Sequence, residues 1–99
     1  MFTNIYKKTK KDFSFLQDYL YFYHHDSHHN VMPSVVFLKE DKRIQIGMHY
    51  EDGKMFVIIY NEPTQVLGED LLENHTFTNR NYDKQVEEVK VILKKYLEE

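Results

Sequence analysis

The chain has 99 residues, of which 41% are hydrophobic and 29% charged, and its formal net charge is −3. This balance is typical of a globular domain and not of a disordered chain, so we expect residues 1–99 to form a single domain. The absence of cysteine excludes disulfides, thiolate chemistry and cysteine-ligated zinc. The small net charge selects no class of partner. No apolar run reaches the roughly 18 residues of a membrane helix, so we expect a cytoplasmic protein without a membrane partner.

Two features of the composition bear on the source of the chain. It contains no alanine, and it uses 11 lysines against 2 arginines. Such usage is typical of AT-rich genes. Our hypothesis is a low-GC bacterium, or a phage or mobile element of one.

The first quarter of the chain predicts one helix. Residues 1–8 read as a short edge strand or as an irregular lead-in. Over residues 9–24, Phe13, Leu16, Leu20 and Tyr23 follow the 3-4-3 spacing of an amphipathic helix. The aromatic run at 19–23 favours a strand instead. Because strict alternation fails across residues 16–19, we favour the helix.

The middle of the chain predicts an antiparallel meander, with strands at about 34–39, 43–50 and 54–61. Asp52-Gly53 is a strong two-residue turn signal, and counting outward from it gives the register. The pairs expected on the core side are Tyr50 with Met55, Met48 with Val57, and Ile46 with Ile59. The pairs expected on the other side are His49 with Phe56, Gly47 with Ile58, and Gln45 with Tyr60. The first hairpin turns through residues 40–42 without a glycine, so its register stays open.

The last third predicts an acidic connection and a helix. The connection at 62–80 carries either a helical turn near 68–74 or a fourth strand near 76–78. The helix, at about 81–98, begins with Asn81 as its N-cap and has a stripe of Val86, Val89 and Leu93. We therefore predict an α+β fold. It has two layers in the order α-β-β-β-α, with a three-stranded meander, or a four-stranded one, against two helices.

The mixed face of the meander is the first candidate for function. If both helices pack on the aliphatic face, aromatic side chains on the other face stay open, which is typical of protein interfaces. We therefore expect a non-enzymatic protein-binding module, of an inhibitor or immunity type, or one that self-associates through the same face. The expected binding residues are Gln45, His49, Phe56, Ile58 and Tyr60.

Two other functions stay open, and an enzyme is not expected because no catalytic constellation is recognisable. On a continued helix, His24 with His28 and His25 with His29 would have the i,i+4 spacing of paired zinc ligands. Otherwise these histidines are part of a solvated loop, and no cofactor is needed. A nucleic-acid partner could use Phe56 and Tyr60 for stacking and the lysines at 7–11 for phosphate, but the negative net charge opposes it.

Overall fold

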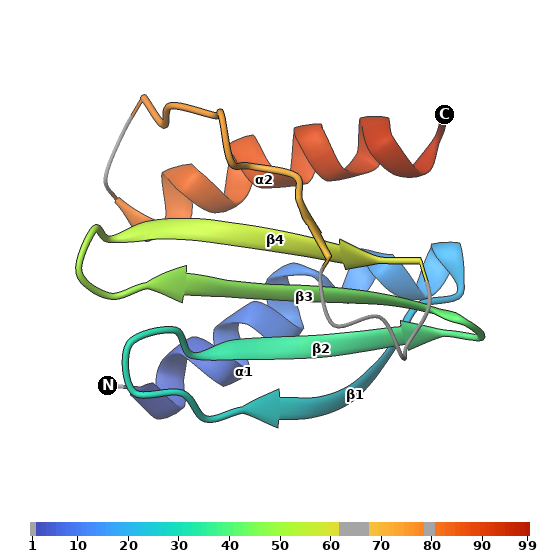
Figure 1. Cartoon of the computed structure of the whole chain (residues 1–99), viewed down its shortest axis with the longest axis horizontal. Helices are drawn as coiled ribbons and strands as arrows, with labels where there is room; N and C mark the ends of the chain where they lie inside the picture. Colours follow the sequence, from blue (N-terminus) through green and yellow to red (C-terminus); the bar gives the residue numbers. More distant parts are fainter. Residues whose placement is uncertain (1, 62–67, 79–80) are drawn as a thin grey trace.

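Five strands form one antiparallel sheet in the order β1-β2-β3-β4-β5. The computed structural model describes residues 2–61, 68–78 and 81–99, with side chains from residue 5 onward. The strands are β1 (Phe22–Ser27), β2 (Ser34–Lys39), β3 (Lys42–His49), β4 (Lys54–Tyr60) and β5 (Glu69–Asp70). The helices are α1 (Phe2–Asp12), the short 3₁₀ helix η1 (Ser14–Tyr19) and α2 (Tyr82–Leu97) (Figure 1). The predicted α+β class and the meander of β2, β3 and β4 are confirmed, and β1 and β5 extend the sheet.

Both helices pack on the same face of the sheet, as the two-layer prediction requires. Side chains alternate between the faces of a strand, so β2, β3 and β4 each present every second residue to the helices. In Figure 1, α1 passes behind the sheet and α2 runs along β4. The buried residues that join helices and sheet in one cluster are Tyr6, Phe13, Leu16, Tyr21, Val35, Phe37, Ile44, Ile46, Met55, Val57, Ile59, Leu72, Val86, Val89 and Leu93.

The register of the second hairpin differs from the prediction by two residues. Met48 pairs with Met55 and Ile46 with Val57, so the loop has four residues instead of two. Gly53 ends this loop in a left-handed conformation, with φ +65°, and its N–H donates to the carbonyl of His49 at 2.8 Å. A shift of two residues keeps every side chain on its predicted face. The predicted pairing was therefore wrong, but the division into an aliphatic and a mixed face is confirmed.

The first hairpin settles which residues of β2 join the core. Lys39 pairs with Lys42, so the turn consists of Glu40 and Asp41. Glu40 adopts φ 49°, a conformation more usual for glycine or asparagine, and so the sequence carried no clear turn signal here. The resulting register places Val35 and Phe37 on the helix side.

The predicted helix at 9–24 is wrong at both ends. Helix α1 begins before residue 9, and Thr9, the first residue of the predicted helix, is buried inside α1 with its hydroxyl 2.8 Å from that of Tyr82. The helical path ends at Leu20, whose φ of 69° reverses the chain while its N–H donates to the carbonyl of Gln17. Residues 22–27 then form β1, so the strand preference of the aromatic run prevails there.

Helix α2 and its cap agree with the prediction. The Asn81 side chain accepts hydrogen bonds from the N–H groups of Asp83 and Lys84, at 2.9 and 3.3 Å. The additional strand of the connection is β5, and residues 76–78, where a strand was one alternative, form none. Residues 62–67 and 79–80 of the predicted connection lie outside the described residues.

The outer edge of β4 is covered by β5 and by a side chain of α2. Strand β5 pairs with Ile58 and Ile59, and the N–H of Leu71 donates to the carbonyl of Val57. Further along, the buried Gln85 side chain of α2 continues this pairing. Its amide oxygen accepts from the Met55 N–H at 3.0 Å and its amide nitrogen donates to the Gly53 carbonyl at 2.8 Å. One glutamine thus satisfies a donor and an acceptor that would otherwise be unpaired.

Replacing Gln85 should therefore destabilise the fold. In Gln85→Leu the Met55 N–H stays buried without an acceptor, and we expect the free energy of unfolding to fall by about 1–3 kcal/mol. Urea denaturation measures this difference. Glu87→Leu, at an exposed position of the same helix, is the matched control and should change little. Equal stability of the two variants would show that the Gln85 bridge contributes nothing.

Candidate functional site

The predicted binding face lies on the side of the sheet away from both helices, but its aromatic residues are buried. Phe56 is 1% exposed and Tyr60 is 9% exposed, while Ile58, Gln45 and His49 are half-buried. The expectation that this face is open is therefore wrong for its two aromatic residues. Their role in binding a partner stays a prediction.

Contacts within the chain explain this burial. The Phe56 ring lies beside His49, with ring centroids 4.9 Å apart, and over Gly47, where a Cβ would come within 2.8 Å of it. The Arg43 guanidinium stacks 3.9 Å from the centre of the Tyr60 ring. A Cβ on Gly68 would lie within 2.5–2.9 Å of Ile58 and Tyr60, so only glycine fits there.

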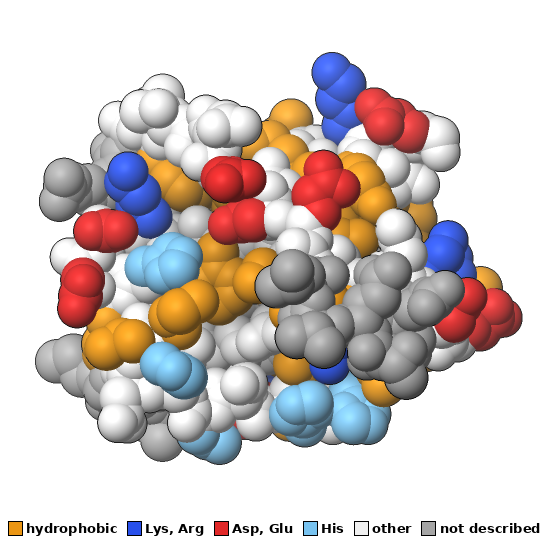
Figure 2. All heavy atoms as spheres, in the orientation of Figure 1, with side chains coloured by type: hydrophobic (Ala, Val, Ile, Leu, Met, Phe, Trp, Pro, Cys, Tyr) orange, Lys and Arg blue, Asp and Glu red, His pale blue; other side chains and the backbone are white. Residues whose placement is uncertain are grey.

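The polar residue of this face also has an internal partner. The Gln45 amide nitrogen donates to the Ser34 hydroxyl at 2.6 Å. Figure 2 shows this side of the molecule, where hydrophobic side chains lie among histidines and acidic residues. The predicted residues thus lie on one face of the sheet, but their side chains already have partners within the chain.

Phe56 should accordingly behave as a core residue. We expect Phe56→Ala to lower the free energy of unfolding by about 3–5 kcal/mol, since the ring is fully enclosed. Phe22→Ala is the matched control because Phe22 is 53% exposed, and it should cost less than about 1 kcal/mol. Urea denaturation compares the two. Unchanged stability of the Phe56→Ala variant would contradict the assignment of Phe56 to the core.

The histidine cluster does not have the predicted helical geometry. His24 and His25 lie in β1, so the i,i+4 pairs with His28 and His29 do not share a helix face. The Nδ1 atoms of His24 and His25 approach each other to 2.6 Å, while the His28 ring packs 4.6 Å from that of Tyr6.

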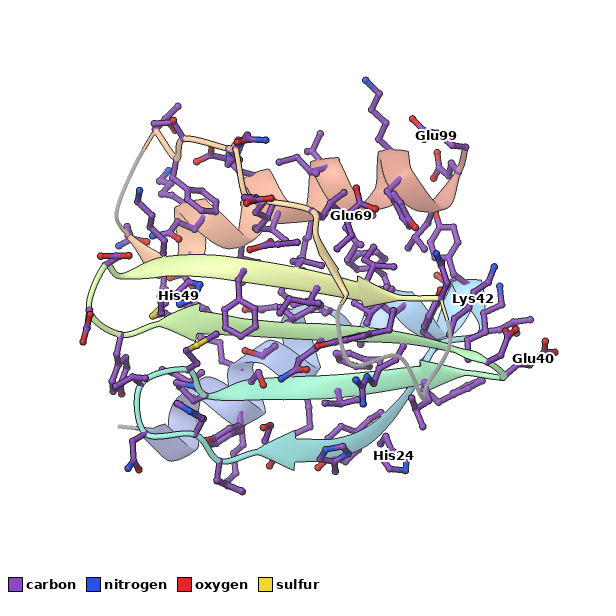
Figure 3. The ribbon with its side chains drawn as sticks, viewed as in Figure 1. His24, Glu40, Lys42, His49, Glu69 and Glu99 are labelled. Atoms are coloured by element: carbon purple, nitrogen blue, oxygen red, sulfur yellow. The ribbon has the colours of Figure 1, made fainter. Side chains whose placement is uncertain are left out.

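No third metal ligand joins these histidines in the described part of the chain. His49 of β3 lies toward the opposite end of the sheet from His24 (Figure 3). Among residues 2–61, 68–78 and 81–99, no three histidine or carboxylate side chains are placed to hold a metal ion.

His75 has a structural partner on α2. Its Nε2 lies 3.2 Å from Oε1 of Glu88, and the Thr78 hydroxyl donates to Oε2 of the same carboxylate at 3.0 Å. Partial desolvation raises the pKa of Glu88, but the hydrogen bonds from Thr78 and His75 outweigh it, and the net pKa is lowered from 4.5. These contacts attach the segment after β5 to α2.

The lowered pKa of Glu88 predicts that its carboxylate makes the stability of the fold depend on pH in the acidic range. A carboxylate whose pKa is lower in the folded state stabilises the fold above its unfolded pKa of about 4.5, and this stabilisation is lost as the pH falls through the folded value. In Glu88→Gln the loss of stability on acidification below about pH 4.5 should be shallower than in the parent protein. Urea midpoints between pH 3 and 6 measure it, with Glu87→Gln as the control. Parallel pH profiles for the parent and Glu88→Gln would contradict this assignment.

The most exposed apolar side chains of the described residues include one just before β1 and two at its start. Leu20, Phe22 and Tyr23 are 59%, 53% and 46% exposed. Sequence reasoning missed them as a site because it placed them on a helix face, although the aromatic run from 19 to 23 was the signal for a strand. In contrast to β4, β1 pairs only with β2 in the described part of the chain, and its outer edge faces no other strand.

The register with β2 assigns the side chains of β1 to the two faces of the sheet. Tyr23 lies opposite Phe37 and Asp26 opposite Val35, so both point to the helix side. There Lys10 of α1 lies over the Tyr23 ring, 4.6 Å from its centre, and 3.8 Å from the Asp26 carboxylate. Phe22 and His25 point to the other side, and a bulge at His24 separates the two halves of the strand.

Comparisons with protein families, with curated proteins and with solved structures find no match for this chain. No helix of the described residues is long and apolar enough to cross a membrane. The exposed surfaces of the fold include the outer edge of β1, beside which Phe22 and Tyr23 are exposed.

Proposed function

We propose that this protein is a binding module that takes up an extended segment of a partner protein along the outer edge of β1. The observation that supports it is the asymmetry of the sheet. One edge is closed by β5 and Gln85, while β1 has an unpaired outer edge among the described residues and carries exposed Phe22 and Tyr23. The predicted role as an inhibitor or immunity-type protein stays a prediction.

Strand addition fits the chemistry of such an edge. An added strand supplies a ladder of main-chain hydrogen bonds, and the side chains beside it give specificity. On β1 the two sides differ, because Phe22 and His25 lie on the helix-free side and Tyr23 with Lys10 on the helix side. Side chains of this protein would therefore contact both faces of a bound partner segment.

The burial of Phe56 and Tyr60 favours a protein partner over a nucleic acid. Bases stack on aromatic rings that are open to solvent, and these two rings are enclosed. The exposed rings of Phe22 and Tyr23 are at β1, beside backbone donors and acceptors in alternation. This pattern matches a peptide backbone, whereas a phosphodiester backbone offers acceptors only.

A neutral peptide can test strand addition. The sequence of residues 33–40 is a suitable probe because it contains β2, which already pairs with β1, and its charges cancel. On adding it to ¹⁵N-labelled protein, we expect amide shift changes and slower hydrogen exchange confined to residues 20–27. Phe22→Ser should weaken binding about 5- to 10-fold, since burying the exposed half of this ring contributes roughly 1 kcal/mol.

The control for this experiment is Val91→Ser. Val91 is 69% exposed on α2, away from β1, so its replacement should leave peptide binding unchanged. Shift changes spread over the whole protein, an equal effect of both variants, or no response at millimolar peptide would contradict the proposal.

A further inference from the structure

A hollow of about 330 Å³ lies where β2 ends, β3 begins and α2 ends. This volume is within the range of about 300–1,000 Å³ that is usual for small-molecule sites. Lys42 and Glu99 lie at this end of the molecule, and Glu40 extends outward from the hairpin turn (Figure 3). Most of the lining comes from lysine, tyrosine and leucine side chains, which are Tyr19, Tyr21, Lys39, Lys42, Tyr96 and Leu97.

The two lysines of this hollow lie directly opposite each other in the first hairpin. Lys39 pairs with Lys42, and both point to the helix side of the sheet, as Val35 and Ile44 do on the same strands. Like charges placed opposite each other destabilise a sheet. In the described part of the chain neither lysine lies within ion-pair distance of a carboxylate, and the Lys39 ammonium lies 5.5 Å from the centre of the Tyr21 ring. Two positive charges therefore face the hollow without a paired carboxylate.

Tyr21 adds a hydrogen-bond donor to the same hollow. The residue is only 3% exposed, yet its hydroxyl forms no hydrogen bond with another described residue and keeps some accessible surface, so it opens onto the hollow. Burial, together with the nearby Tyr96 and Asp41, raises the pKa of Tyr21, so this hydroxyl stays protonated at neutral pH. An acceptor atom of a ligand would supply the bond that the protein does not make.

The negative groups around the hollow are mostly engaged elsewhere. Glu98 accepts a hydrogen bond from the Tyr19 hydroxyl at 2.6 Å, whereas Glu99 is exposed at the rim. The carbonyl groups at the end of α2 favour cations, but α2 has Lys94 and Lys95 in its own last turn. The two hairpin lysines are therefore additional to the cations that the helix itself provides.

We infer that this hollow binds a small phosphate monoester, with the phosphate group between Lys39 and Lys42 and the rest of the molecule against Tyr96 and Leu97. A phosphate monoester carries a charge of about −1.5 to −2 at pH 7, which matches two ammonium groups, whereas a carboxylate balances only one. Lysine binds phosphate as a point charge, and the Tyr21 hydroxyl donates to a phosphate oxygen. The tyrosine and leucine lining favours a ligand with a ring over inorganic phosphate. This inference does not depend on strand addition at β1.

Four small probes test the inference in a low-salt buffer that contains no phosphate. Phenyl phosphate has both expected parts, while inorganic phosphate lacks the ring, benzoate has a single charge and phenol has none. On titrating ¹⁵N-labelled protein with phenyl phosphate, we expect amide shift changes centred on Tyr21, Lys39, Lys42 and Leu97. Its Kd should be about tenfold lower than the Kd of inorganic phosphate or benzoate, and phenol should not saturate the protein.

Variants of the lining locate the effect. Lys39→Gln/Lys42→Gln should abolish binding of phenyl phosphate without lowering the melting temperature, because it removes a pair of like charges. Tyr21→Phe keeps the ring and removes the donor, so it should weaken binding about fivefold. The matched control is Lys7→Gln/Lys84→Gln, which changes the net charge equally at two exposed positions outside the hollow and should leave binding unchanged.

Several outcomes would overturn the inference. Equal loss of binding in both double variants would reduce it to a general charge effect, and benzoate that binds as tightly as phenyl phosphate would make the hollow a carboxylate site. Shift changes away from the hollow, or no saturation at millimolar phenyl phosphate, would also overturn it. Glu99→Gln tests whether Glu99 is itself the counter-charge of the lysines. We expect tighter binding of phenyl phosphate in this variant, whereas a lower melting temperature with unchanged binding would contradict the site.

Discussion

The placement of both helices on one face of the sheet is the constraint on which the other features depend. It follows from the alternation of apolar side chains along β2, β3 and β4, which places Val35, Ile44, Val57 and the other core residues of these strands on one face. Helix α2 is then fixed against α1 by the Thr9–Tyr82 contact, and against η1 by the Tyr19 hydroxyl, which donates to Glu98 at 2.6 Å. With both helices packed on one face, the side chains of the opposite face contact one another and Gly68.

The sequence is most informative where side chains alternate and turns are short. The predicted faces of β3 and β4 were correct because a two-residue error in the loop preserves the alternation, and Asn81 was identified because a cap depends on residues three positions away. The Glu40 turn was not predictable in the same way, since its positive φ is imposed by the pairing of β2 with β3 and not by the residue type.

The candidate site was harder to predict because it depends on long-range contacts. Burial of Tyr60 needs Arg43 from β3 and the close approach of Gly68, and no local pattern specifies either. The start of β1 depends on Leu20, a non-glycine residue in the left-handed region, at a conformational cost of roughly 1–2 kcal/mol. The helix-like spacing of apolar residues therefore extends beyond Leu20, where the chain turns. For this reason the exposed aromatic residues of β1 were predicted to lie on a helix.

The two edges of the sheet show why an unpaired strand can be selective and not merely prone to aggregation. Proteins protect sheet edges with bulges and with lysines, and β1 has a bulge at His24 and Lys10 stacked against Tyr23. The bulge interrupts a regular ladder and Lys10 places a charge beside the edge, so both features oppose the indiscriminate strand pairing that leads to aggregation. A segment added at β1 has to fit the register on both sides of His24, and this requirement makes the edge selective.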